Sequence, residues 1–319
     1  MLRFFRVLLF VSAALSAAIG TAAEFPTRTI RIVVPFAPGG PADTVNRLVA
    51  AELARVLSTT VIVENKPGAG SVAAAQYVLN APADGYTLLV VTNTFTMPAA
   101  FDKLPYDTLR DFRPIGNVIS QPNVLVANAA FPPNTVPELV AYAKREKTPV
   151  MFATTSQGSP LTLSIELFGR AAGFPTVQVP YAGSAPAQFA VVGGQVPLMF
   201  DGWYFSRQQV NAGKLKIIAA FGERRMKELP DVPTVAEFYP GLSSNSIQGL
   251  VVRREVPDDV VGALAAAVEK VVKSPAFAEK TVGNLGNPEW MNPTEFGAFL
   301  ESETKKWSDA SKAAKFKAN

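Results

Sequence analysis

The hydrophobic residues fall into short apolar runs that alternate with longer amphipathic segments. Residues 29–36, 60–64 and 87–92 are β-branched apolar runs, which are typical of buried strands. Apolar residues from Val45 to Leu57 recur at steps of three and four, which predicts a helix. Because the strands are continuously apolar rather than alternating, we expect a mainly parallel sheet with helices on both faces.

The same order of elements recurs further along the chain. Strands are predicted at 150–153, 176–179, 196–200 and 215–221, with helices between them, and two amphipathic stripes at 260–272 and 296–307 predict C-terminal helices. Two short apolar segments, 124–127 and 250–252, bracket the second unit and are interpreted as crossings between lobes. The prediction is a two-lobed α/β protein, in which residues 24–124 and 250–319 form a discontinuous lobe 1 and residues 125–249 form lobe 2.

Residues 1–23 have the three parts of a secretory signal peptide. Arg3 and Arg6 precede an apolar stretch over 7–15, and small residues then run to Ala23. A membrane anchor is the alternative, but the stretch is shorter than the roughly 18 residues that a spanning helix needs. We therefore expect export to the periplasm, with cleavage near Ala23.

The composition excludes several kinds of chemistry. The chain has no Cys, so disulfides, thiolate catalysis and a lipid-anchoring cysteine are excluded. It has no His, which removes the commonest general base and every metal site built on imidazole. The net charge of +4 falls to +2 without Arg3 and Arg6, and the charges are interspersed, so no nucleic-acid partner is expected.

Four loops rich in Gly, Ser and Thr follow predicted strands, at residues 38–43, 67–71, 154–160 and 181–186. Loops at the carboxyl ends of parallel strands converge into a crevice. Glycine lets backbone N–H groups at the next helix start approach an anion, which the helix dipole also attracts. These loops contain neither Lys nor Arg, which favours a carboxylate over a multiply charged phosphate.

Two other motifs give only weak evidence for a nucleotide site or a catalytic serine. The turn Gly68-Ala69-Gly70 lacks the third glycine of a dinucleotide fingerprint. Ser302 and Lys305 match the Ser-x-x-Lys pattern of serine acyl enzymes, but they lie midway along a terminal helix, and we interpret the match as chance.

Residues at two strand ends have two interpretations. Asp201 is either a ligand contact or the cap of the helix that begins near Trp203. The aromatic residues Phe95, Trp203 and Tyr204 either line the distal part of the pocket or belong to the core.

Several motifs occur in order along the predicted mature chain, and they include PFAPGGPAD at 35–43, VENKPGAG at 63–70, ADGYTLL at 83–89, VPYAGSAP at 179–186 and LPDVPTVAE at 229–237. Together they resemble the Bordetella-uptake-gene (Bug) family, the substrate receptors of tripartite tricarboxylate transporters. The resemblance implies a type II-like periplasmic-binding-protein (Venus flytrap) fold and no cofactor. It also implies a monomer that captures a small mono-, di- or tricarboxylate for the membrane components of a transporter.

In that family the first loop and its neighbours hold one ligand carboxylate through backbone amides and bridging waters. Most of the candidate ligand-binding residues are carried over motif by motif: Phe36, Pro38, Gly39, Gly40, Ala42, Asp43, Gly68, Ala69, Gly70, Ser156, Gly158, Ser159, Ala182, Gly183, Ser184 and Asp201. Asn93, Thr94 and Thr162 complete the predicted set.

The chain departs from the family pattern at four positions. Thr162 stands where the family commonly has His, Ala182 stands where it often has Lys or Arg, and Phe95 and Trp203 are bulkier than usual. The resemblance therefore does not carry over the identity of the ligand. Loss of a cation and gain of aromatic bulk suggest, as a hypothesis, a ligand with an apolar or aromatic distal part.

Two other functions are weighed against transport. A ligand-sensing protein would bind in the same way and dock onto a signalling receptor, which the sequence does not distinguish. An enzyme acting on a small organic acid would need a group to move protons, and only Asp43, Asp201, Lys66 and hydroxyls are near the predicted crevice. We therefore predict a binding protein and not an enzyme.

Overall fold

The structure is a computed structural model that describes residues 25–68, 71–97, 104–154, 160–181 and 184–314. The first unit alternates strand and helix, as the apolar pattern predicts: β1 (Ile30–Val34), α2 (Pro41–Val56), β2 (Val61–Asn65), α3 (Val72–Leu79), β3 (Thr87–Thr92) and the short α4 (Asn93–Thr96). Strand β1 pairs in parallel with both β2 and β3. The carboxyl ends of all three strands therefore meet at one edge.

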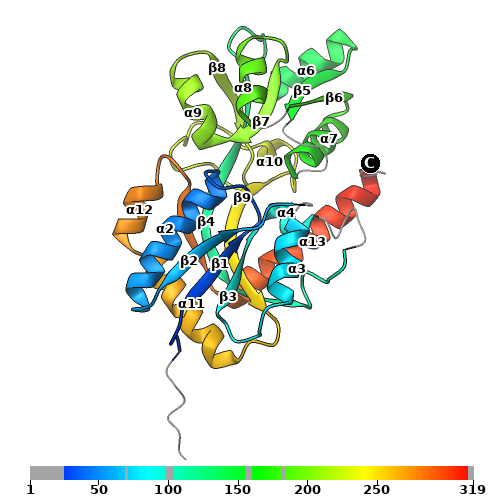
Figure 1. The fold of residues 1–319 in the computed structure, drawn as a ribbon. Helices are drawn as coiled ribbons and strands as arrows, with labels where there is room; N and C mark the ends of the chain where they lie inside the picture. The colour runs from blue at the N-terminus through cyan, green and yellow to red at the C-terminus, as the bar shows by residue number, and fades with distance from the viewer. Residues whose placement is uncertain (1–24, 69–70, 98–103, 155–159, 182–183, 315–319) are drawn as a thin grey trace, which may run out of the picture.

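The second unit repeats this arrangement. Its elements are α6 (Val136–Glu146), β5 (Val150–Thr154), α7 (Pro160–Ala172), β6 (Thr176–Pro180), α8 (Ser184–Val192), β7 (Leu198–Gly202), α9 (Trp203–Asn211) and β8 (Leu215–Ala220). Strand β5 pairs in parallel with β6 and β7. We call the half built on β1–β3 lobe 1 and the half built on β5–β8 lobe 2 (Figure 1).

Strand β4 (Phe112–Asn128) runs from lobe 1 into lobe 2, and β9 (Asn245–Arg253) begins at this crossing and pairs with β3 and with the lobe 1 part of β4. Up to Pro122, β4 pairs antiparallel with β9, and from Asn123 onward it pairs antiparallel with β7 and β8. The sheets are therefore mixed rather than wholly parallel. The sequence pattern indicated only the ends of these strands, because Pro114 and Gly116 interrupt the apolar pattern of β4 where its register with β9 shifts.

The chain after β9 returns to lobe 1. It forms α11 (Asp258–Val272), α12 (Pro275–Thr281), β10 (Asn287–Met291) and α13 (Pro293–Ala314), while α10 (Val235–Phe238) precedes β9 (Figure 1). Strand β10 pairs with the lobe 1 part of β4. The lobe boundaries at residues 124 and 250 remain predictions.

Helices cover both faces of each sheet. In lobe 1, α2 and α11 pack on one face around Ile32 and Leu264, and α3 and α13 pack on the other face around Leu89 and Phe296. Lobe 2 likewise has two apolar clusters, around Phe152 and around Val124. Among the described helices, none is both long and apolar enough to cross a membrane.

Candidate functional site

Helix starts gather where parallel strands end. In lobe 1, α2 and α3 follow β1 and β2 through the glycine loops. In lobe 2, α7, α8 and α9 follow β5, β6 and β7 along the chain. A helix start has N–H groups without partners in the helix and the positive end of the helix dipole. Both lobes therefore have helix starts at the carboxyl ends of parallel strands, where an anion would be attracted.

The β1–α2 loop has one glycine that its backbone requires. Gly39 has φ +82°, which is the left-handed region that side chains rarely adopt. Gly40, the N-cap of α2, has an extended backbone with φ −76°, and a Cβ there would meet only the carbonyl oxygen of Ala37, at 3.6 Å. The conformational requirement therefore lies at Gly39, and Gly40 is needed only if a ligand approaches its backbone closely.

Asp43 organises this loop. Its side chain is buried and accepts hydrogen bonds from the backbone N–H of Gly39 (2.9 Å), from Arg47 Nε (2.8 Å) and from Asn65 Nδ2 (2.9 Å). The hydrogen bond from Arg47, together with those from Gly39 and Asn65, outweighs burial and lowers the pKa of Asp43 to about 2. The predicted site residue Asp43 is thus a carboxylate whose partners in the structure are protein groups.

Asn65, at the end of β2, ties this loop to the neighbouring strand. Its Nδ2 donates to the carbonyl of Phe36 at 3.0 Å as well as to Asp43, and its Oδ1 accepts from Arg47 at 3.1 Å. Asn65 and Arg47 are not among the site residues that the sequence predicted. The spacing of Asp43 and Arg47 by four residues on a helix was the one available signal for Arg47.

The cations beside these two loops are already paired. Arg47 forms an ion pair with Asp43 at 2.8 Å. Lys66 forms one with Glu64 at 2.8 Å and lies over the ring of Tyr77, 4.5 Å from its centroid. Both cations are therefore already paired with carboxylates of the protein, which agrees with recognition of an anionic ligand by backbone amides.

The second loop leads into α3 without a side-chain cap. Gly68 has φ +142° and is exposed. Ser71, a residue type that often caps helices, occupies the N-cap position of α3, but its backbone is left-handed and its side chain accepts no capping hydrogen bond. Its hydroxyl lies instead 3.4 Å from that of Thr94.

Asn93, a predicted ligand contact after β3, is used by the protein itself. Its Nδ2 donates to the carbonyl of Asn245 and its Oδ1 accepts from the N–H of Ile247, both at 2.8 Å. Its side-chain amide therefore fixes the end of β3 to the start of β9. The hydroxyl of the neighbouring Thr94 lies 2.9 Å from that of Thr92.

In lobe 2, Asp201 ends β7 as a buried carboxyl group. It accepts hydrogen bonds from the N–H of Gly202 (2.9 Å), from Ser206 Oγ (2.8 Å) and from Gln188 Nε2 (3.1 Å). The N-cap of α9 is Gly202, so Asp201 is one residue too early to be the cap, although it binds the first turn of that helix. Burial outweighs these hydrogen bonds and raises the pKa of Asp201 to about 6.

The raised pKa of Asp201 predicts that the stability of the folded protein depends on pH. An aspartate has a pKa near 3.8 when unfolded, so between about pH 4 and pH 6 the folded state binds the Asp201 proton more tightly than the unfolded state does. The free energy of unfolding should therefore fall by up to about 3 kcal/mol as the pH rises through this window. Asp201→Asn should remove this fall.

Urea unfolding at pH 4 and pH 7 checks the prediction. Asp309→Asn is the matched control, because Asp309 is exposed and pairs with Lys305 on the surface of α13. The same pH dependence in wild type and Asp201→Asn would show that Asp201 does not titrate in this range.

The other predicted site residues lie as follows. Thr162 is buried on the first turn of α7, and its carbonyl accepts from Gln178 Nε2 at 3.0 Å. Ser184 begins α8 and is half-buried. In lobe 1, Ala42 is buried on the first turn of α2, Phe36 is half-buried and Pro38 is exposed. The remaining candidates lie outside the described residues: Ala69, Gly70, Ser156, Gly158, Ser159, Ala182 and Gly183.

The two bulky aromatic residues belong to the core. Phe95 is 2% exposed and packs edge-to-face against Phe112, with ring centroids 5.5 Å apart. Trp203 is 5% exposed, in the apolar cluster around Val124. The core interpretation is confirmed for both.

Tyr204 has a polar role that the sequence did not indicate. Its hydroxyl lies 3.0 Å from Glu228 Oε1 and 2.9 Å from Asn287 Oδ1, and Asn287 Nδ2 donates to the same Glu228 oxygen at 2.9 Å. Its single phenolic proton can serve one of the two acceptors at a time. Because Asn287 lies on β10, this network joins lobe 2 to lobe 1.

Two α/β lobes joined by β4 and β9, with helix starts at the ends of their parallel strands, define a solute-binding protein of the periplasmic-binding-protein fold. Residues 45–315 match the model of the tripartite tricarboxylate transporter family receptors (TctC), and the chain belongs to this family. This confirms the prediction from the Bug-family motifs. The family consists of solute receptors rather than enzymes.

Solved structures agree with this assignment. Rpa4515 of R. palustris, solved with adipate, is 30% identical over 92% of this chain and 99% of its own, with a TM-score of 0.78. MatC from Rhodopseudomonas palustris, with bound malate, is 33% identical over 90% of this chain and 99% of its own, with a TM-score of 0.73. The periplasmic binding protein BugD is 32% identical over 92% of this chain and 100% of its own, with a TM-score of 0.75.

Proposed function

We propose that the protein is exported to the periplasm, loses residues 1–23, and captures a small carboxylate for the membrane components of a tripartite transporter. The observation that carries the ligand class is the pairing of Arg47 and Lys66 within lobe 1, beside loops that hold no cation. Such a site suits an anion that amide N–H groups and ordered water can satisfy. Adipate and malate, bound by the two relatives, belong to this class.

The proposal favours aliphatic over aromatic acids. The hypothesis of an aromatic distal part rested on the loss of a cation and on the bulk of Phe95 and Trp203, and both of these aromatic side chains are buried in apolar clusters. Short aliphatic dicarboxylates are therefore the first ligands to test.

Isothermal titration with adipate, malate, benzoate and the uncharged diamide of adipate tests the proposal. We expect one-to-one binding of at least one aliphatic diacid, weaker binding of benzoate, and no binding of the diamide. The diamide matches adipate in length and differs in charge, so it isolates the contribution of the carboxylates. The proposal fails if none of the acids binds, or if the diamide binds as tightly as the acid.

A further inference from the structure

The C-terminal helix α13 packs on both lobes. Its first turns carry Phe296 and Leu300, which are buried in the lobe 1 cluster around Leu89. Further along, Trp307 is 1% exposed and forms a separate apolar cluster with Met97 and Leu163. Met97 follows α4 of lobe 1, whereas Leu163 lies on α7 of lobe 2. The last turns of α13 accordingly lie beside α7 (Figure 1).

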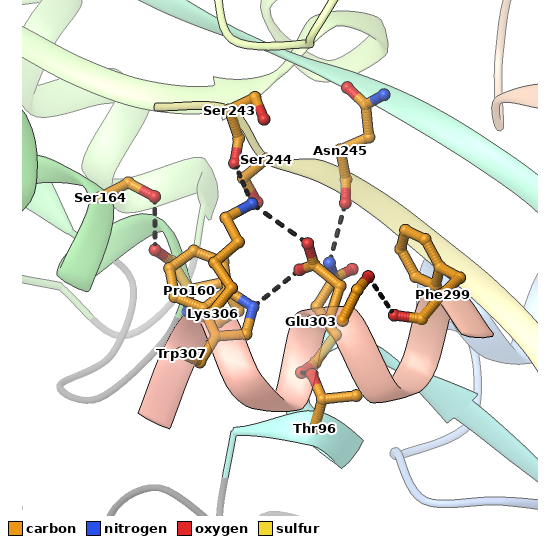
Figure 2. A network of polar contacts seen from close by, with 12 residues as sticks. Thr96, Pro160, Ser164, Ser243, Ser244, Asn245, Phe299, Glu303, Lys306 and Trp307 are labelled. Atoms are coloured by element: carbon orange, nitrogen blue, oxygen red, sulfur yellow. Dashed lines mark hydrogen bonds and ion pairs between the residues drawn. The ribbon is translucent and has the colours of Figure 1, made fainter. Parts of the chain in front are cut away.

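Polar contacts fix the same part of α13 to the segment that leads into β9. Glu303 accepts from Trp307 Nε1 at 2.7 Å and from Lys306 Nζ at 3.1 Å (Figure 2). Lys306 Nζ also donates to the carbonyl of Ser243. The next carbonyl, that of Ser244, accepts from Asn123 Nδ2 at 2.8 Å, at the point where β4 changes its pairing. Hydrogen bonds through Glu303 and Lys306 thus connect Trp307 to Ser243, next to the point where the chain crosses between the lobes.

The apolar partners of Trp307 lie on the two elements that carry candidate ligand residues. Leu163 follows Thr162 on the first turn of α7, and Met97 ends the segment that begins with Asn93 and Thr94. The face of α7 that meets Trp307 is apolar, with Leu163 fully buried and Leu167 packed beside it. A change in the angle between the lobes would move α7 against Trp307.

We propose that α13 is a further connection between the lobes, besides the crossings of the chain and the Tyr204 network, and that Trp307 is its positioning residue. By packing against α4 and α7 together, Trp307 limits how far the lobes separate in the ligand-free protein. It thereby keeps the two sets of ligand loops close to the spacing that capture requires. The effect on affinity rests on the proposed function, whereas the effect on lobe separation does not.

The absence of cysteine makes lobe separation directly measurable. Spin labels on Ala51→Cys and Gln208→Cys, two exposed positions on α2 and α9, report the distance between the lobes in a pulsed electron resonance experiment. We expect one narrow distance distribution in the otherwise wild-type protein and a broader, longer one with Trp307→Ala. Trp290→Ala is the matched control, because Trp290 packs within lobe 1, and its distribution should stay narrow.

Two further measurements separate this role from a general loss of folding. Circular dichroism melts identify any variant that is unfolded, and Lys306→Met, which removes the contact to Ser243 and keeps Trp307, should broaden the distribution to a smaller extent. With adipate as the probe, Trp307→Ala should bind about tenfold more weakly than wild type, because fewer ligand-free molecules have the lobe spacing that capture requires. Trp290→Ala should bind like wild type.

The inference is overturned if folded Trp307→Ala and Lys306→Met both give the wild-type distance distribution. It is also overturned if Trp290→Ala broadens the distribution as much as Trp307→Ala does. If adipate does not bind to any form, the proposed ligand is wrong, and the distance measurement still decides whether α13 connects the lobes.

Discussion

Asp43→Ala should weaken carboxylate binding about tenfold or more and lower the free energy of unfolding by about 3 kcal/mol. The substitution leaves Gly39 N–H, Arg47 Nε and Asn65 Nδ2 without the acceptor that now joins them. Buried donors without a partner cost about 1 to 3 kcal/mol each, and the total is reduced because Arg47 and Gly39 are exposed to water and Asn65 Nδ2 keeps its bond to Phe36. The loop between β1 and α2 would also lose its preorganised shape, which weakens binding.

Titration calorimetry and urea unfolding measure the two effects. Asp43→Asn keeps one acceptor oxygen, so its ligand affinity and its free energy of unfolding should both lie between those of Asp43→Ala and wild type. The matched control is Glu269→Gln, because Glu269 forms an ion pair with Lys273 of the same spacing on the exposed face of α11. It should change stability by no more than about 0.5 kcal/mol. Wild-type affinity in folded Asp43→Ala would show that Asp43 does not shape the site.

Gly249→Val should destabilise the protein by about 3 kcal/mol through overpacking. A Cβ at Gly249 would lie 2.3 Å from Phe296 Cζ and 2.8 Å from the carbonyl oxygen of Gly116. The ring of Phe296 anchors α13 to lobe 1, and Gly116 lies on the adjacent strand β4. Movement of Gly116 would disturb the pairing of β4 with β9, and movement of Phe296 would disturb the packing of α13 on lobe 1.

Gly262→Ala is the matched control for this prediction, because a Cβ there meets no atom within 4 Å. Gly262 lies inside α11, so the alanine should stabilise the helix by up to about 1 kcal/mol. Thermal and urea unfolding of both variants provide the comparison. Equal stability of Gly249→Val and wild type would mean that α13 does not pack against β9 as described.

Local sequence signals predicted much of the fold. Periodicity predicted the strand–helix alternation, because continuous apolar runs such as 87–92 are buried over most of their length. The first part of β4 escaped prediction, since its Pro114 and Gly116 are typical of turns and are tolerated only beside a register shift. That shift depends on pairing with β9, more than a hundred residues away.

The candidate site was predicted in outline only. The loops and helix starts follow from local pattern, but the partners of individual side chains do not. Asn93 bonds to Asn245 and Ile247, and Asp43 to Asn65, through contacts between segments distant in sequence. Resemblance to a family placed Asn93 and Asp43 near the ligand without showing that the protein already uses both side chains.

We expect backbone amides of the glycine loops, and not a cationic side chain, to hold the ligand carboxylate. A crystal structure of the protein with a bound acid, adipate first, would show which groups bind it. The carboxylate oxygens should lie within hydrogen-bond distance of N–H groups or bridging waters in residues 36–43 and 66–71, with Arg47 still paired with Asp43 and Lys66 still paired with Glu64. A carboxylate paired directly with Arg47 or Lys66, or bound outside the crevice between the lobes, would contradict it.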